Sequence, residues 1–197
     1  MNYLVRYVYS PCWDTIDAVT LQHAPWLTPN AITARAQLCH NGQSLFLRME
    51  AKETDILARL TGPLDQVCHD SCLEFFFAPM EADSRYLNFE VNPLGNVYLG
   101  FGAERPTRVR QIVKKPAPFR TETFRTADSW GFVMEIPLSF IRLYFPEAAF
   151  SGTAACNFYK CGDETVSPHY LAWSPLTSDT PDYHRRWDFG MIAFEQP

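Results

Sequence analysis

Two stretches of alternating residues, Cys72 to Phe77 and Tyr86 to Asn92, constrain the fold of this chain most strongly. Successive side chains of a β-strand point to opposite faces of a sheet, so a period of two separates two sets of residues. In the first stretch three large apolar residues share one face, and Glu74 lies on the other. The sequence therefore predicts strands with one strongly apolar face and with acidic and amide groups on the opposite face.

Turn signals divide the rest of the chain into strands of similar spacing. Asn41-Gly42 is a strong hairpin signal between strands expected over residues 33–39 and 44–50, and Pro93-Leu-Gly95 joins 85–92 to 96–101. Further strands are expected over residues 3–9, 108–113, 119–125, 130–136, 154–160, 170–173 and 189–194, and short helices over 54–60 and 137–144. This order predicts one domain over residues 1–197, an antiparallel β-sandwich with one or two short helices.

Composition narrows the classes of partner. Hydrophobic residues make up 47% of the 197 residues and aromatic residues 15%, enough to fill a two-sheet core. The formal charge of −5 gives no general attraction to phosphate backbones, so we expect no nucleic-acid partner. No apolar run approaches the roughly 20 residues that span a bilayer, and the N-terminus lacks a leader pattern. We expect no membrane partner and a cytoplasmic location, although a secreted protein trimmed of its leader would look the same.

The cysteine pattern favours free thiols. Six cysteines are scattered through a chain too large to depend on a disulfide framework. Cys68, His69 and Cys72 lie close in sequence, but no second pair follows at zinc-finger spacing. The spacing therefore does not predict a zinc site.

The order of several short motifs resembles the family 9-like carbohydrate-binding modules, within the wider DOMON-like group of β-sandwiches. The motifs are Pro25-Trp26, Leu45 to Leu47, Asp70 to Phe76, Asn92 to Gly95, Trp130 to Leu138, Asn157 to Tyr159, Tyr170 to Trp173 and Phe189-Gly190. The resemblance implies non-catalytic binding of a sugar, held between aromatic rings and hydrogen-bonded by acidic and amide side chains. Trp173 resembles one of the two rings, and Glu74 the carboxylate that follows the other.

The chain departs from that family pattern at one position. The second tryptophan has no counterpart between Asp65 and Ser71, where only Cys68 and His69 offer a side chain for the opposite wall. Family members also carry structural calcium, for which no ligand set can be assigned in this sequence. Because of these departures, the sugar preference of the family does not carry over directly to this chain.

A sugar presents an apolar C–H face and a rim of hydroxyls, so its site needs an exposed aromatic plane beside hydrogen-bond acceptors and donors. The ligand-binding candidates in this chain are Trp173, Glu74, Glu90, Asn92, Asn157, Tyr159 and His69. The alternative interpretation makes the strand residues among them ordinary polar positions of a half-solvated sheet, and Trp173 a core residue. Trp13, Trp26 and Trp130 are assigned to the core or its lid, and Trp187 to the rim of the site or the sandwich edge.

The residues leave other functions open. Glu74 and Glu90 have the chemistry of the acid and base of a glycan-active enzyme. Met134 and His169 are possible axial ligands if the domain binds haem. One basic cluster, formed by Arg105, Arg108, Arg110, Lys114 and Lys115, is more typical of a solvated edge strand than of an anion site.

Overall fold

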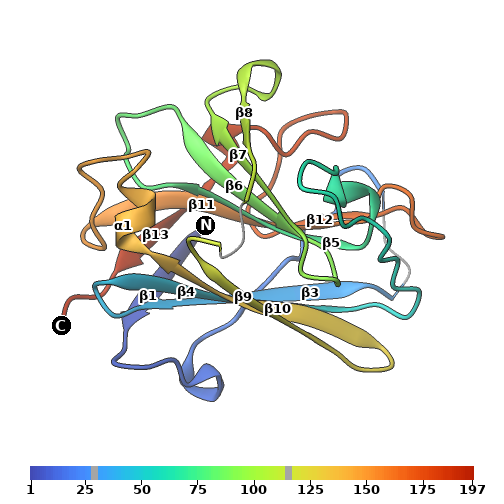
Figure 1. Ribbon diagram of the computed structural model, residues 1–197, viewed down its shortest axis with the longest axis horizontal. Helices are drawn as coiled ribbons and strands as arrows, with labels where there is room; N and C mark the ends of the chain where they lie inside the picture. The colour runs from blue at the N-terminus through green and yellow to red at the C-terminus, as the bar shows by residue number, and fades with distance from the viewer. Residues whose placement is uncertain (28–30, 114–116) are drawn as a thin grey trace.

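Two stacked layers of β-strands make up most of the computed structural model, which describes residues 1–27, 31–113 and 117–197 (Figure 1). The first layer has the order β8 (Val109–Gln111), β7 (Val97–Gly102), β6 (Tyr86–Val91), β5 (Cys72–Ala78), β11 (Thr153–Cys161) and β13 (Gly190–Phe194), with β12 (Tyr170–Ala172) also paired to β11. The second has the order β3 (Thr33–His40), β4 (Ser44–Lys52), β10 (Ser129–Pro137) and β9 (Arg120–Arg125), with β2 (Val19–Thr20) paired to β3. The predicted sandwich is confirmed.

Strand β1 (Asn2–Tyr7) connects the two layers. Its first residues pair in parallel with β13, and Arg6 and Tyr7 pair in parallel with β3, so the hydrogen-bonded ladder is continuous from β8 to β9. Every other strand pairing is antiparallel, including the hairpin predicted at Asn41-Gly42 and the one at Pro93 to Gly95. The two parallel pairings were not expected, because the sequence of a strand does not record the direction of its neighbours.

The main core lies between the layers. Phe75 and Phe77 of β5 stack with centroids 5.6 Å apart, and Phe158 of β11 lies 5.3 Å from Phe75. Opposite them, β4 and β10 contribute Leu47 and Phe132, both fully buried. The alternation of residues in the sequence thus predicted correctly which face of β5 is apolar.

The short helices were only half predicted. Pro137 opens a helical turn, α1 (Leu138–Ile141), as expected. The helix expected over residues 54–60 is wrong. The backbone N–H groups of Arg59 and Leu60 both donate to Asp70 Oδ2, at 2.8 and 2.9 Å, and that of Leu57 donates to Ser71 Oγ at 3.0 Å. These amides are held by side chains that follow later in the chain, so they do not form helical bonds.

The residues that the structure describes also include four single turns of 3-10 helix: Trp13–Thr15, Val67–His69, Arg105–Thr107 and Arg186–Asp188. In the described residues, no helix combines the length and apolar content needed to cross a bilayer. A second, smaller hydrophobic cluster covers the outer face of the first layer, where Phe76 and Tyr159 pack beneath Tyr183 and Phe189 of the C-terminal segment. This segment folds back over the sheet and encloses the pocket described next.

Candidate functional site

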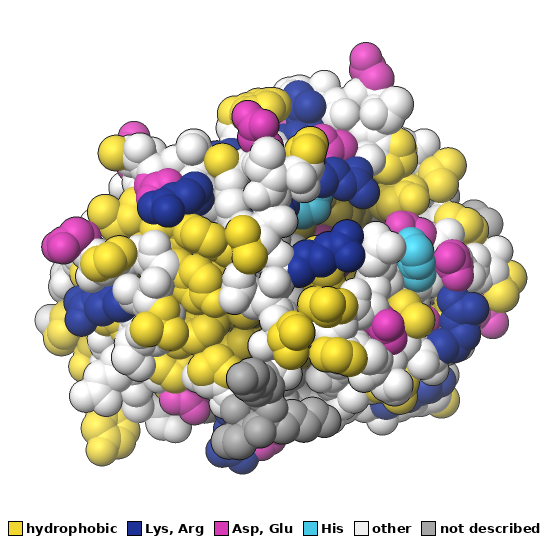
Figure 2. Space-filling view, turned by 45° about the horizontal axis from the view of Figure 1, so that its top comes forward, with side chains coloured by type: hydrophobic (Ala, Val, Ile, Leu, Met, Phe, Trp, Pro, Cys, Tyr) yellow, Lys and Arg dark blue, Asp and Glu magenta, His cyan; other side chains and the backbone are white. Residues whose placement is uncertain are grey.

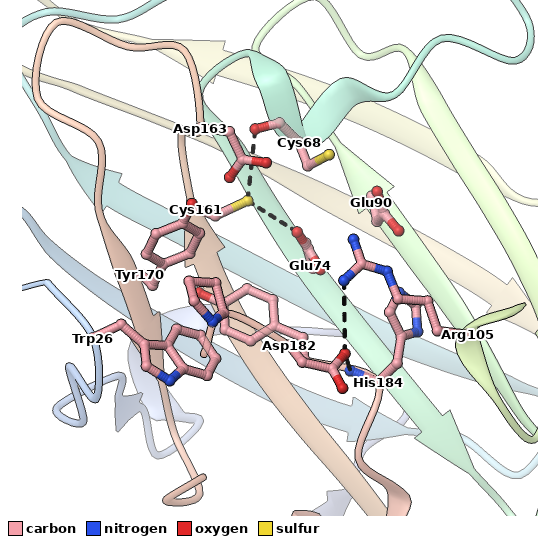
Figure 3. Close-up of a pocket in the computed structure, with 12 residues that line it drawn as sticks. Trp26, Cys68, Glu74, Glu90, Arg105, Cys161, Asp163, Tyr170, Asp182 and His184 are labelled. Carbon is pink, nitrogen blue, oxygen red and sulfur yellow. Dashed lines mark hydrogen bonds and ion pairs between the residues drawn. The ribbon is translucent and has the colours of Figure 1, made fainter. Parts of the chain in front are cut away.

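A small pocket of about 90 Å³ opens on the outer face of the first layer, where β5 begins and where β6 and β11 end (Figure 3). Its wall combines carboxyl, thiol and aromatic side chains from strands that are far apart in the sequence. A larger groove of about 640 Å³ runs past Leu94 and Phe119, but the described residues that line it include no ionisable side chain. The smaller pocket differs from this groove in combining buried carboxyl groups with aromatic rings, the kinds of side chain suited to specific recognition.

Two carboxyl groups form the floor. Glu74 of β5 and Glu90 of β6 lie directly opposite each other across the strand pair, and both face away from the main core. They are 3% and 7% exposed. The Cys161 thiol donates to Glu74 Oε1 at 3.0 Å, and the Asn88 amide donates to Glu90 Oε1 at 2.6 Å. Each carboxyl is thus anchored through one oxygen.

Burial changes the acidity of this pair. Desolvation raises the pKa of Glu90 to about 7, although the nearby charge of Arg108 and the Asn88 amide act in the opposite direction. Desolvation also raises the pKa of Glu74 well above its ordinary value, and the adjacent Glu90 adds to the rise. Two carboxyls in one buried site titrate as a unit. Near neutral pH the pair retains a proton, so it is able to donate as well as accept hydrogen bonds.

Aromatic rings form one wall. Trp26 lies 5.5 Å from Tyr170 and 5.6 Å from Tyr183 between ring centroids, and all three line the pocket. The Trp26 indole donates to the carbonyl of Ser178 at 2.7 Å, which fixes the orientation of the ring. Tyr183 stacks on Tyr159 with centroids 4.0 Å apart. The wall is therefore rigid, and it is built from segments on either side of the chain's midpoint.

Charged side chains form the rim. Arg105 Nη1 lies 3.9 Å from Asp182 Oδ1, and the Arg105 side chain is 63% exposed. His184 Nδ1 lies 3.0 Å from the Tyr86 hydroxyl. Burial, together with the charges of Arg108 and Arg105, lowers the pKa of His184 to about 3, so its ring is neutral at physiological pH. The loosely held Arg105 is the part of the rim that is freest to move.

Among the predicted residues, the structure brings Glu74 and Glu90 together in this pocket. The ring assigned to Trp173 is a correction. Trp173 is 4% exposed and packs in the main core beside Phe158 and Tyr3, so it presents no face to a ligand. A Cβ at Gly190 would lie 2.5 Å from the Trp173 ring, which indicates how closely the backbone covers it.

The amide and phenol candidates are also engaged in the structure. Asn92 is fully buried and donates to Asp70 Oδ2 and to the carbonyl of Leu60, at 2.9 and 2.8 Å. Asn157 is bonded through both of its amide atoms to the backbone of Ser174. These bonds satisfy side chains that would otherwise be buried without partners. The two asparagines therefore fix loops and do not line the pocket.

Tyr159 and His69 lie next to the pocket but do not line it. Tyr159 is fully buried beneath Tyr183, and its hydroxyl donates to the carbonyl of that residue at 3.2 Å. His69 Nδ1 lies 3.3 Å from Glu164 Oε1 on the outside. Of Cys68 and His69, which offered a side chain for the opposite wall, Cys68 is half-buried and lines the pocket with its thiol.

Within the part of the chain that the structure describes, two clusters of three donors lie close enough to hold a metal ion: Cys68, His69 and Asp163, and Cys72, Glu74 and Cys161. Calcium prefers six to eight oxygen ligands, and each cluster contains at least one thiol. Neither cluster fits that ion, so structural calcium stays a prediction from the resemblance. All six cysteines are free, and Cys12 alone among them is exposed.

The haem interpretation conflicts with the packing. Met134 is fully buried in the main core, and both ring nitrogens of His169 already have partners, Lys160 Nζ at 2.6 Å and the Ser167 carbonyl at 2.7 Å. Neither side chain is placed to ligate iron. The prediction that these residues could serve as axial ligands is therefore wrong for this conformation.

The predicted basic cluster divides into parts with different surroundings. Arg105 lies on the pocket rim, and the guanidinium of Arg108 is buried over the Tyr86 ring at 4.0 Å. Lys114 and Lys115 fall outside the described residues. On the face seen in Figure 2, lysine and arginine side chains are separated by acidic, hydrophobic and neutral ones. That the protein has no nucleic-acid partner stays a prediction.

Sequence reasoning missed most of the wall and rim. Trp26 was assigned to the core or its lid, and Asp163, Tyr170, Asp182 and His184 were not chosen. These residues lie at strand ends and in loops, where side-chain directions follow no regular repeat and cannot be predicted from the sequence pattern. One signal was present in the order of motifs, since Pro25-Trp26 and the segment beginning at Tyr170 both belong to it.

The comparisons agree on one family. A profile described as carbohydrate-binding family 9 matches residues 10–194. A crystal structure from Bacteroides uniformis, of a protein for which carbohydrate binding is proposed, is 27% identical; it aligns over 98% of this chain and 99% of its own, with a TM-score of 0.85. No curated protein sequence matches.

Two further structures are family 9 carbohydrate-binding modules from Caldicellulosiruptor kristjanssonii. The complex with glucose is 14% identical, with a TM-score of 0.67 over 100% of this chain and 97% of its own. The complex with cellotriose is 13% identical, with a TM-score of 0.69 over 100% and 95%. At this identity the likeness supports the fold.

Proposed function

Because the chain belongs to carbohydrate-binding family 9, we propose that it binds a sugar reversibly, without cleaving it, in the pocket floored by Glu74 and Glu90. One observation carries the proposal: an aromatic wall and two buried carboxyls meet in a single pocket. A sugar ring has an apolar C–H face that packs on an aromatic plane, and hydroxyls that bond to carboxyl oxygens. The pocket offers both kinds of contact in one place.

The roles differ from those that the resemblance implied. Trp26, supported by Tyr170, is the ring on which the sugar packs, in place of Trp173. Glu74 and Glu90 accept hydrogen bonds from sugar hydroxyls through their Oε2 atoms, and Arg105 moves away from Asp182 to donate to the sugar from the rim. Each of these side chains lines the pocket, and the Arg105 contact at 3.9 Å is weak enough to be exchanged.

The sugar class is a separate part of the proposal. Glucose and cellotriose are the ligands of the Caldicellulosiruptor modules, which share the fold with this chain. A pocket of about 90 Å³ with one aromatic wall suits a single sugar ring more than a long stretch of polysaccharide. We therefore propose recognition of one sugar unit, free or at the end of a chain.

The glycan-active enzyme is the less favoured function. A glycosidase places its acid and its second carboxyl on opposite sides of the scissile bond, about 5 to 9.5 Å apart. Glu74 and Glu90 are neighbours on the floor of one sheet, so both lie on the same side of any ligand. We expect no release of product from chromogenic glycosides.

Isothermal titration calorimetry tests the function. Wild type and Glu74→Gln are titrated with a panel of monosaccharides and disaccharides that includes glucose, and with cellotriose. Glu122→Gln removes an exposed carboxyl of β9 and serves as the matched control. We expect saturable binding in wild type and in the control, and a large loss in Glu74→Gln with an unchanged circular dichroism spectrum. Equal binding by Glu74→Gln would contradict the assignment of this pocket.

A further inference from the structure

The acidic side chains that line the pocket outnumber the basic ones. Four carboxyls line it, those of Glu74, Glu90, Asp163 and Asp182, and among the described lining residues the one guanidinium is that of Arg105. That guanidinium faces Asp182. His184 adds no charge at neutral pH, because burial lowers its pKa to about 3. A ligand in this pocket is therefore surrounded by more carboxyl groups than basic groups.

Arg108 compensates only one of the floor carboxyls. Its half-buried guanidinium acts on Glu90 through its charge and donates to Asn88 Oδ1 and to the carbonyl of Gly102. Asn88 in turn donates to Glu90 through its amide nitrogen. Glu74 has no such support: among the described residues, its hydrogen-bond donor is the Cys161 thiol. A thiol is a weak donor and brings no charge.

The two floor carboxyls are arranged to share one donor group. They occupy directly opposed positions on neighbouring antiparallel strands, where Cβ atoms lie about 4.5 to 5.5 Å apart. Each is anchored through Oε1, at Cys161 and at Asn88, and no described residue donates to either Oε2. The Oε2 atoms of two cross-strand neighbours thus remain available to a ligand that enters the pocket.

Resting on the proposed function, we propose that the preferred ligand is a sugar with a free amino group, whose ammonium lies between Glu74 and Glu90. A neutral hydroxyl supplies one donor and no charge, whereas an ammonium supplies three donors and the missing positive charge. Charge-assisted hydrogen bonds are roughly twice as strong as neutral ones. The amine distinguishes this ligand from glucose, which offers the same C–H face to Trp26.

Proton release is a direct consequence of this arrangement. In the free protein the floor pair retains a proton near neutral pH, because desolvation raises the pKa of both carboxyls. An ammonium placed between them favours their ionised forms, so its binding expels that proton to the buffer. The other groups that act on the pair are Cys161, Asn88, Arg105, Arg108 and Asp163. A neutral sugar lacks the charge to drive the release.

The test compares three ligands by calorimetry at pH 6.5: glucosamine, N-acetylglucosamine as its uncharged counterpart, and glucose. Each is titrated in two buffers that differ in ionisation enthalpy, so that protons released on binding are counted. We expect glucosamine to bind at least about tenfold more tightly than glucose and to release protons. Acetylation should remove both effects. Glu90→Gln should lose most of the preference for the amine, while Glu122→Gln keeps it.

The outcomes separate this inference from the function on which it rests. Glucose binding with an equal or weaker affinity for glucosamine would overturn the inference and leave the sugar site intact. Persistence of the amine preference in Glu90→Gln would overturn it as well, because the charge would then be recognised elsewhere. If none of the three ligands and no sugar of the wider panel gave detectable binding, the proposed function would be overturned.

Discussion

Two buried polar clusters lie on opposite faces of β11, and they are built in opposite ways. On the inner face, Lys160 Nζ lies 3.1 Å from Glu53 Oε2 and 2.6 Å from His169 Nε2, while the Trp130 indole and the Ser71 hydroxyl both donate to Glu53 at 2.9 Å. On the outer face, the next residue of the strand, Cys161, donates to Glu74 in the pocket.

The two clusters differ in what balances their buried carboxyl groups. The inner cluster pairs its carboxylate with a cation and surrounds it with donors from the protein, as a buried charge requires. The outer cluster leaves carboxyl oxygens facing a cavity and raises the pKa of both acids. We propose that the inner cluster is complete within the folded protein, and that the outer one is completed by a ligand.

The largest effect is expected from breaking the inner cluster. Lys160→Met leaves Glu53 buried without its cation, and removal of one partner of a buried pair destabilises a protein by about 3–5 kcal/mol. Urea denaturation followed by circular dichroism measures the loss. The double variant Lys160→Met, Glu53→Gln should recover part of it, because no unpaired charge remains. A loss below about 1 kcal/mol would contradict the structural role of this cluster.

The corresponding change in the outer cluster should act on binding. Glu74→Gln removes a charge that the folded protein holds unfavourably, so its free energy of unfolding should equal or exceed that of wild type near neutral pH. Its affinity for the sugar should fall at least about tenfold, since a buried hydrogen-bonding group left without its partner costs about 1–3 kcal/mol. If this variant were as unstable as Lys160→Met, the contrast between the clusters would fail.

Half-buried Trp26 and buried Trp173 provide a third comparison. Trp26→Ala removes the proposed stacking ring and should weaken sugar binding about fivefold to tenfold. Trp173→Phe, in the main core, should lower the thermal midpoint and leave the affinity unchanged. Calorimetric titration at a temperature where both variants are folded separates the two effects. Loss of binding in Trp173→Phe alone would restore the ring that the family resemblance implied.

The smallest expected effect is a pH dependence of stability that comes from the pocket. The folded-state pKa of Glu90 is raised to about 7 from an ordinary value of 4.5, so the folded protein binds this proton more tightly than the unfolded chain does. The contribution to stability is present in full below about pH 4.5 and is lost as the pH rises through 7. His184 has the opposite effect, because its pKa is lowered and its contribution is lost as the pH falls.

Thermal unfolding of wild type and Glu90→Gln between pH 5 and 8 isolates this contribution. The wild-type midpoint should fall relative to that of the variant by a few degrees over this range. Because His184 is present in both proteins, its contribution cancels in the difference. If the unfolding midpoints of wild type and Glu90→Gln changed equally with pH, Glu90 would not be held in its protonated form by the folded protein.

The strands were predictable because their signals are local. The period of two in β5 and β6 assigned Glu74 and Glu90 to the face opposite the core, and Asn41-Gly42 identified a hairpin. The helix expected over residues 54–60 failed for the converse reason. Its amides are captured by Asp70, which follows Leu60 by 10 residues and which no local pattern connects to them.

The wall and rim of the pocket could not be predicted because they depend on long-range contacts. The Trp26 indole is oriented by Ser178, 152 residues later in the sequence. His184 is placed by Tyr86, which precedes it by 98 residues. Alternation also cannot tell which of two faces a ligand approaches, and Asn92, although on the same face as Glu90, is used to bind Asp70.

A crystal structure of the protein soaked with the sugar that binds most tightly tests the central claim most directly. We expect a single sugar ring packed on Trp26, with its polar groups within hydrogen-bond distance of Glu74 and Glu90. Density for the sugar at another place, such as over the exposed ring of Trp187, with this pocket left unchanged, would contradict it.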